Sequence, residues 1–355
     1  MKLVKSFDIG EFRGIRGLKK PIELGKFNVL VGRNSSDKTS ILQALYLLAM
    51  PIRGYAIPPY GKSATEYIES LTGAKNRLIY GYSGEARISF ELEVKGVFRN
   101  PHSSLSSIFP PTLEAVNVEK VEVEMSTEEA YVEVKVTVSS DGGKTEVYLS
   151  WDKYETLINS LNPKAILALY IPNNSDAYTS LQKSILKDFD DIAKKGLHTK
   201  VFREYLKDLV YDKFTEIFIR GEELFARKEI EGTATYISLN DIGEGLKRFI
   251  LTYFAVEHLN PALILWDDIE IAMHPSLMNT SLKWLTDSDR QVVIATHSFD
   301  VLHSLTLIEP KDAKVILLRK DDNDVIHHKS LEIDELEEIL EKGIDPRAVI
   351  ESLVE

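Results

Sequence analysis

The stretch Gly32–Ser40, GRNSSDKTS, combines residue types at a spacing that suits phosphate binding. A strand-like apolar segment precedes it and a helix-like pattern follows it, which is the setting of the nucleotide-binding loop G-x-x-x-x-G-K-[ST]. Backbone N–H groups at the start of that helix would point at phosphates, and the helix dipole would add positive charge. Lys38 is expected to reach the β- and γ-phosphates of ATP, and the Thr39 hydroxyl to bind Mg²⁺. We assign to nucleotide binding Gly32, Arg33, Asn34, Ser35, Ser36, Asp37, Lys38, Thr39 and Ser40.

One position of this loop departs from the pattern, because Asp37 stands where the second glycine belongs. Asp can adopt the left-handed backbone conformation, so the shape of the loop can survive. A carboxylate that faced the phosphates from about 4 Å would repel each unit charge by roughly 4 kcal/mol, or about a thousandfold in affinity. A carboxylate that points to solvent or pairs with a lysine would cost little. The sequence therefore leaves open both an active nucleotide site and a scaffold that has lost nucleotide binding.

Two carboxylates stand at the end of an apolar, strand-like segment farther along the chain, LILWDD at Leu263–Asp268. Phosphoryl chemistry needs one carboxylate near a Mg²⁺ ion and another that polarises the attacking water. In this interpretation Asp267 binds Mg²⁺, and Asp268 takes the place of the general base. The alternative is a pair of turn or helix-capping aspartates after a strand.

Composition narrows the class of protein. The 355 residues are 44% hydrophobic, carry a net charge of −12 and include no cysteine. The length suits one large domain or two smaller ones. The acidic balance argues against a surface that coats DNA, although a local basic patch is compatible with it. There is no disulfide framework, no apolar run long enough to span a membrane and no signal-peptide pattern, so we expect a cytoplasmic protein.

Further segments bring out a resemblance to a known family. The motifs IGEGLKR, WDDIEIAMHP and VIATHSFDVL begin at residues 242, 266 and 293, and the N-terminal part contains SFDIGEFRGIRG and NVLVGRN. Together they resemble the ATP-binding-cassette heads of the SMC/RecF/OLD group. The resemblance covers residues 1–50 and 236–305, and the middle of the chain matches in general layout only. It implies an ATPase head that dimerises around two ATP molecules as a switch in DNA repair, defence or genome maintenance.

The resemblance also assigns residues. Gly243 and Gly245 fall at the signature motif, which contacts the γ-phosphate of the nucleotide held by the partner subunit. His297 falls at the switch histidine, which contacts the γ-phosphate and which we group with Asp268 as catalytic. Arg13 and Arg16 lie in the opening hairpin, where this group contacts the base or ribose of the nucleotide, and we assign Arg13 to nucleotide binding; exposed hairpin arginines are the alternative. His274 is expected to shape a loop at the dimer face.

Some positions depart from the family pattern. Asp268 stands where the group has Glu, so the shorter base is either tolerated, with a water bridging the gap, or slows hydrolysis. Glu244 adds a negative charge to the signature motif. The Q-loop glutamine of the group has no clear counterpart, and Asn173, Asn174 and Gln182 are candidates.

We expect an α/β fold, an ABC-type P-loop NTPase head with a mixed, largely parallel core sheet, an antiparallel β subdomain and a short helical insertion in place of a long coiled coil. The alternation in VEKVEVEM, AYVEVKVTV and TEVYLSW predicts the antiparallel strands. IPPYG at 57–61 and the segment 100–112 read as irregular. The chain is expected to form a single head, whose parts are a nucleotide-binding core (1–50 and 236–331), the subdomain with the insertion (51–235) and a C-terminal helical segment (332–355).

Partners follow from the resemblance. We expect a homodimer formed on ATP, possible contact with DNA and no membrane association. The lysine-rich region 183–207 also carries acidic residues, which favours a solvated face over a DNA-binding one. Many OLD proteins carry a nuclease domain after the ATPase; the chain after Thr296–Ser298 is too short for one, so any nuclease or effector is expected to be a separate partner.

Overall fold

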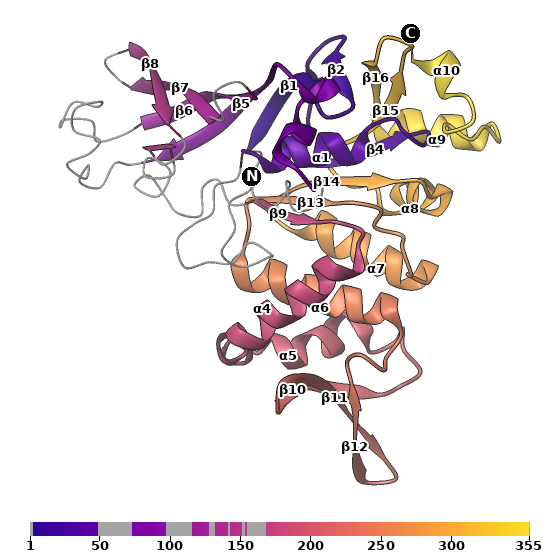
Figure 1. Ribbon diagram of the computed structural model, residues 1–355. Helices are drawn as coiled ribbons and strands as arrows, with labels where there is room; N and C mark the ends of the chain where they lie inside the picture. Colours follow the sequence, from indigo (N-terminus) through magenta and orange to yellow (C-terminus); the bar gives the residue numbers. More distant parts are fainter. Residues whose placement is uncertain are drawn as a thin grey trace.

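The computed structural model describes residues 3–48, 73–96, 116–127, 132–140, 143–150, 153–154 and 168–354. Figure 1 shows a central sheet with helices on either side, a lobe of antiparallel strands extending from it and a small second sheet at the far end. The irregular segments predicted at 57–61 and 100–112 lie outside the described residues.

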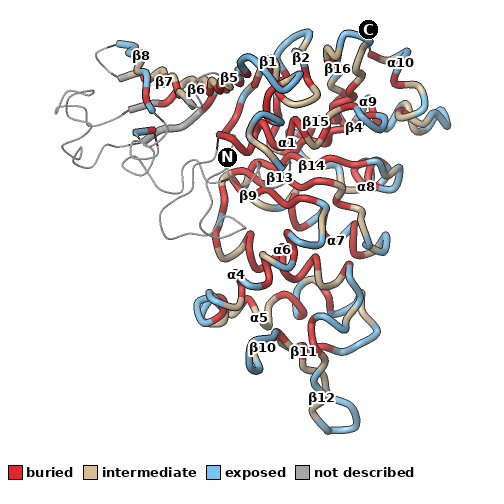
Figure 2. The backbone as a smooth tube through the Cα atoms, viewed as in Figure 1, coloured by how far each residue is buried: buried red, intermediate tan, exposed pale blue. Residues whose placement is uncertain are grey.

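Parallel strands form the centre of the sheet, and all their carboxyl ends meet at one edge. Four of these strands are buried at every residue, as expected for parallel strands that are covered on both faces (Figure 2). The same edge therefore collects the phosphate-loop sequence and the residues that follow the other strands. In spatial order these strands are β9 (Ala168–Ile171), β13 (Leu263–Trp266), β14 (Gln291–Thr296), β4 (Phe27–Gly32) and β15 (Ala313–Lys320).

Antiparallel strands continue this sheet beyond β15, so that thirteen strands join in one sheet within the described part of the chain. In β6 and β7 alternate valines are buried, which confirms the predicted period-two strands. The fold class expected from the sequence is confirmed. These strands are β16 (Val325–Leu331), β2 (Ile15–Leu18), β1 (Val4–Phe12), β3 (Ile22–Glu23), β5 (Glu85–Gly96), β6 (Val116–Ser126), β7 (Val132–Ser140) and β8 (Gly143–Ser150). Their pairs are antiparallel except for that of β16 with β2, which is parallel.

Helices cover both sides of the parallel strands. α1 packs against β4, β9, β13 and β14 on one side, whereas α6, α7 and α8 lie on the other (Figure 1). None of the described helices is long and apolar enough to cross a membrane. The helices are α1 (Lys38–Tyr46), α4 (Ser175–Lys194), α5 (Leu197–Lys200), α6 (Glu244–Leu259), α7 (Pro275–Asp287), α8 (Phe299–Ile308), α9 (Ile333–Glu341) and α10 (Ile350–Leu353), with the short turns η1 (Lys75–Leu78), η2 (Tyr80–Tyr82) and the π-helical η3 (Val201–Leu206).

A compact insertion lies between β9 and α6 in the chain. It consists of α4, α5 and η3 followed by a three-stranded antiparallel sheet, whose inner face buries Ile217, Leu224 and Ala226. Several cations of the lysine-rich stretch pair with acidic neighbours, as Lys194 does with Asp191 at 2.8 Å, which fits a solvated face. The strands of the small sheet are β10 (Phe214–Arg220), β11 (Glu223–Ile230) and β12 (Thr233–Ser238).

Candidate nucleotide-binding site

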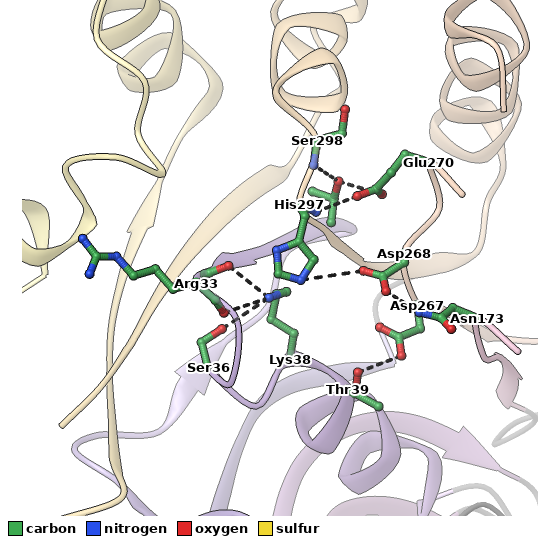
Figure 3. A network of polar contacts seen from close by, with 12 residues as sticks. Arg33, Ser36, Lys38, Thr39, Asn173, Asp267, Asp268, Glu270, His297 and Ser298 are labelled. Carbon is green, nitrogen blue, oxygen red and sulfur yellow. Dashed lines mark hydrogen bonds and ion pairs between the residues drawn. The ribbon is translucent and has the colours of Figure 1, made fainter. Parts of the chain in front are cut away.

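The loop between β4 and α1 is closed around the amine of Lys38. Its Nζ donates to the carbonyls of Gly32, at 3.0 Å, and Arg33, at 3.3 Å, and lies 3.4 Å from Ser36 Oγ (Figure 3). Gly32 permits this closure, because a Cβ there would lie 2.2 Å from Ser36 Oγ. Burial lowers the pKa of Lys38, and the nearby Asp268 and Asp267 oppose that shift. The ammonium thus sits at the N-terminus of α1, where the helix dipole also favours a phosphate.

Asp37 takes up the left-handed conformation that the missing glycine would have, with φ 59° and ψ 26°. Its carboxylate accepts a hydrogen bond from Ser40 Oγ at 3.0 Å and forms an ion pair with Lys320 Nζ of β15, also at 3.0 Å. It packs against Gly14 in the β1–β2 turn, where an added Cβ would meet it at 2.6 Å. The sequence left open whether this carboxylate faces the phosphates, points to solvent or pairs with a lysine. In the structure it pairs with a lysine.

Thr39 and Asp267 form the second part of the site. Thr39 Oγ1 donates to Asp267 Oδ2 at 2.8 Å, so the start of α1 meets the end of β13. Asp267 is 4% exposed, and burial raises its pKa to about 6. The Thr39 hydroxyl and the buried Asp267 carboxylate are oxygen donors that suit Mg²⁺, which prefers oxygen ligands and keeps waters and phosphate oxygens in its shell. The described residues contain no cluster of three or more His, Cys, Asp or Glu that could hold a metal ion.

Asp268 and His297 face each other across the same edge (Figure 3). His297 Nε2 lies 4.0 Å from Asp268 Oδ1, and Asn173, just after β9, donates its side-chain amide to Asp268 Oδ2. Burial and Lys38 lower the pKa of His297, although Asp268 and Glu270 oppose the shift. The imidazole is therefore neutral at pH 7 and can donate one hydrogen bond to a phosphate oxygen.

The three candidates for the Q-loop position separate in the structure. Asn173 lies at the site on Asp268, whereas the Asn174 side chain caps α4 by accepting from Ala177 N at 2.7 Å. Gln182 is buried along α4. Asn173 comes two residues after the end of the apolar strand β9, but the sequence offered the three candidates together and did not single it out.

Glu270 orders the loop that carries His297, a role the sequence did not predict. It accepts hydrogen bonds from Thr296 Oγ1 at 2.9 Å and from His297 N at 2.7 Å. Because Glu270 lies two residues after the carboxylate pair, it links the loop after β13 to the end of β14. The side chain is a candidate to transmit the state of one loop to the other.

The C-terminal segment also reaches the site, which the sequence did not indicate. Arg347 donates to the carbonyl of His297 at 2.5 Å, lies over the ring of Phe299 and is held by Asp345. Glu351 forms an ion pair at 3.6 Å with Arg33 of the phosphate loop. One segment thus contacts both the phosphate loop and the histidine loop.

The two arginines of the opening hairpin have different environments. Arg13 donates to Gln43 of α1, and its pKa is lowered by burial but supported by Tyr170, Asp37 and Asp267. Arg16 is exposed and lies 3.9 Å from Glu11. Of the two, Arg13 lies close enough to Asp37 and Asp267 to interact with their charges, whereas Arg16 is a surface arginine.

The signature residues lie away from this edge, at the N-terminus of α6. Gly243 is exposed with open space beside it, whereas a Cβ on Gly245 would meet the carbonyl of Ala272 at 2.1 Å. Glu244 forms an ion pair with Arg248 at 3.0 Å, one turn farther along α6.

His274, expected to shape a loop, caps α7 by accepting from Ser276 N. A cavity of about 400 Å³ opens beside these residues. Gly245 is thus needed for packing, and Gly243 is the one available to a ligand.

A protein-family model described as "AAA domain, putative AbiEii toxin, Type IV TA system" matches residues 139–303, less than half of the chain. An uncharacterized protein of Methanocaldococcus jannaschii is 38% identical over 55 residues, which make up 16% of this chain and 25% of that protein. The match therefore spans a quarter of the length of that relative.

Solved structures show the fold. An SMC head bound to the C-winged helix domain of ScpA superposes with a TM-score of 0.59 at 13% identity, covering 93% of this chain and 98% of that one. An SMC head with an extended coiled coil, bound to the C-terminal domain of ScpA and derived from Pyrococcus furiosus, gives 0.53 at 11% identity, covering 96% and 99%. The architecture is that of an SMC head.

Proposed function

We propose that this chain, which has the fold of an SMC head, binds and hydrolyses ATP and that two copies close around ATP as a switch. The observation that carries the proposal is the convergence of Lys38, the Thr39–Asp267 pair and the Asp268–His297 pair at one edge of the parallel sheet. These are the groups that hold phosphates, hold a metal and act on water.

Each side chain has a task in this proposal. Lys38 and the N-terminus of α1 bind the β- and γ-phosphates. Thr39 and Asp267 would hold Mg²⁺, which when bound neutralises charge on the phosphate oxygens. Asp268 accepts a proton from the attacking water, and the amide of Asn173 keeps its carboxylate in place. His297, neutral at pH 7, donates to the γ-phosphate.

The dimer part of the proposal rests on the signature region. Gly243 stands exposed at the start of a 16-residue helix, where a partner's γ-phosphate would meet backbone N–H groups and the helix dipole. The pairing of Glu244 with Arg248 supports this role, because it offsets the negative charge at this end of the helix.

The biological setting is proposed from the relatives. The description of the matching family model names a type IV toxin–antitoxin system, and the two similar SMC heads are bound to domains of ScpA. We place the switch in defence or genome maintenance, with DNA and a separate effector or nuclease as the partners to test.

The test is ATP binding and steady-state hydrolysis with Mg²⁺, measured for this chain beside Asp37→Gly and Lys38→Ala. We expect the native chain to bind and turn over ATP and Lys38→Ala to lose both. If only Asp37→Gly were active, the native chain would be a disabled ATPase and the scaffold alternative would hold. If none of the three bound ATP, the assignment of the nucleotide site would be wrong.

A further inference from the structure

The ion pair between Asp37 and Lys320 joins the phosphate loop to β15. The two side chains are 15% and 21% exposed, so the 3.0 Å contact between Lys320 Nζ and Asp37 Oδ2 is shielded from water. The other carboxylate oxygen accepts from Ser40 Oγ, on the first turn of α1. Both oxygens of Asp37 thus have partners on the side of β15 and α1, while Lys38 contacts carbonyls of the loop.

The surroundings keep Lys320 in this place. Its ammonium also lies 2.7 Å from Asp324 Oδ1, and the other oxygen of Asp324 accepts from the Tyr80 hydroxyl at 2.7 Å. Burial alone would lower the pKa of Lys320, but hydrogen bonds to Asp324 and Asp37 outweigh it, so the pKa lies above its usual value. Lys320 is charged throughout the neutral range.

Gly14 completes the arrangement from the other side. A Cβ at this position would lie 2.6 Å from Asp37 Oδ1. Only glycine leaves room for the carboxylate in its observed orientation, and Gly14 itself has an ordinary negative φ that alanine can adopt. The turn between β1 and β2 and the end of β15 therefore form a built receptacle for a carboxylate.

We propose that Lys320 is a positioning residue for ATP binding, which holds and neutralises Asp37 so that a loop without its second glycine still accepts a polyphosphate. The inference rests on the proposed function and specifies how this chain performs it. Without Lys320, a half-buried carboxylate next to the phosphates would have no cation, and it would repel the incoming charge. In a loop with glycine at position 37, Lys320 would have nothing to compensate.

The experiment is a double-mutant cycle on the full chain, with the Kd of Mg-ATP measured by titration calorimetry at fixed ionic strength. The four proteins are the native chain, Lys320→Met, Asp37→Gly and the double variant. We expect Lys320→Met to weaken Mg-ATP about 100-fold when Asp37 is present and by less than about threefold when glycine replaces it. Thermal unfolding of each variant checks that it is folded.

Matched variants separate charge compensation from general damage. Lys320→Arg keeps the cation and should stay within about threefold of the native Kd. Lys314→Met removes a lysine from the same strand, where it faces Glu23 instead, and should leave Kd unchanged. Gly14→Ala pushes on the Asp37 carboxylate from the side opposite to Lys320, so it should weaken the binding of Mg-ATP much more in the native loop than in the Asp37→Gly loop. This variant tests the proposal even if Lys320→Met does not fold.

The outcomes are distinct. Native-like binding by Lys320→Met and by Gly14→Ala would overturn the inference and leave the proposed function standing. An equal loss in both backgrounds would mean that Lys320 acts on ATP independently of Asp37, which also overturns it. Binding by Asp37→Gly without binding by the native chain would show that Lys320 does not compensate. Absence of binding in all proteins would refute the proposed function itself and reduce the pair to a structural contact.

Discussion

Two helix N-termini in this protein suit phosphate binding, and they are built in opposite ways. The start of α1 is enclosed: Lys38 is 5% exposed, Asp37 is held by Lys320, and Thr39 is bonded to Asp267. The start of α6 is open, with Gly243 exposed beside a cavity. In the function proposed above, the chain by itself assembles one half of the composite site, the enclosed half at α1, and presents the other, open half at α6 to a partner.

The largest effect is expected at the enclosed half, from Asp268→Asn. Asparagine keeps the acceptor for Asn173 but cannot take a proton from water, so kcat should fall by about 100-fold or more with ATP affinity unchanged. The variant should also hold ATP without turnover and accumulate as a dimer, which light scattering after gel filtration measures. Full activity in Asp268→Asn would show that another residue is the general base, and that Asp268 is not part of the enclosed half.

The open half is tested by Gly243→Trp. A Cβ there would meet no atom of its own subunit within 4 Å, so we expect the monomer to fold and bind ATP normally, whereas the indole should block the approach of a partner. We expect hydrolysis to fall by about 100-fold, because phosphate stabilisation by the partner is lost. Gly245→Ala is the contrasting variant: its Cβ clashes with the Ala272 carbonyl, and the loss should appear in thermal stability. Normal turnover in Gly243→Trp would contradict a composite site.

The enclosed half also contains a buried charge whose cost depends on pH. Burial raises the pKa of Asp267 to about 6, so in metal-free protein its contribution to stability is present below the unfolded pKa and is lost as pH rises through about 6. Asp267→Asn does not titrate. In EDTA it should therefore be more stable than the native chain at pH 7, by about 3 kcal/mol, with a smaller gap at pH 5. Denaturant unfolding at both pH values measures the free energy of unfolding of the two proteins. A difference between them that did not grow with pH would show that burial does not raise the pKa of Asp267.

The sequence predicted those features that local pattern determines. The phosphate loop, the carboxylates after β13 and the parallel strands all follow from short stretches of residue types at fixed spacing. The orientation of Asp37 could not be predicted, because its partner Lys320 comes from the other end of the chain and only the order of strands β4 and β15 brings them together. The contact between Arg347 and the His297 carbonyl could not be predicted either, because it joins residues that lie 50 positions apart in the sequence.

The smallest effect is expected from Arg347→Ala, which tests whether the enclosed half needs the C-terminal segment. The guanidinium donates to the backbone of His297 and packs on Phe299, so it acts on the position of the histidine loop and not on ATP. We expect kcat to fall by about three- to tenfold with KM unchanged, since a single positioning hydrogen bond is worth about 1 kcal/mol. Glu351→Ala, which removes the contact with Arg33 at the phosphate loop, should instead change KM. If both variants shifted KM alone, the segment would serve the loop only, and Glu270 would remain as the support of His297 that the structure identifies.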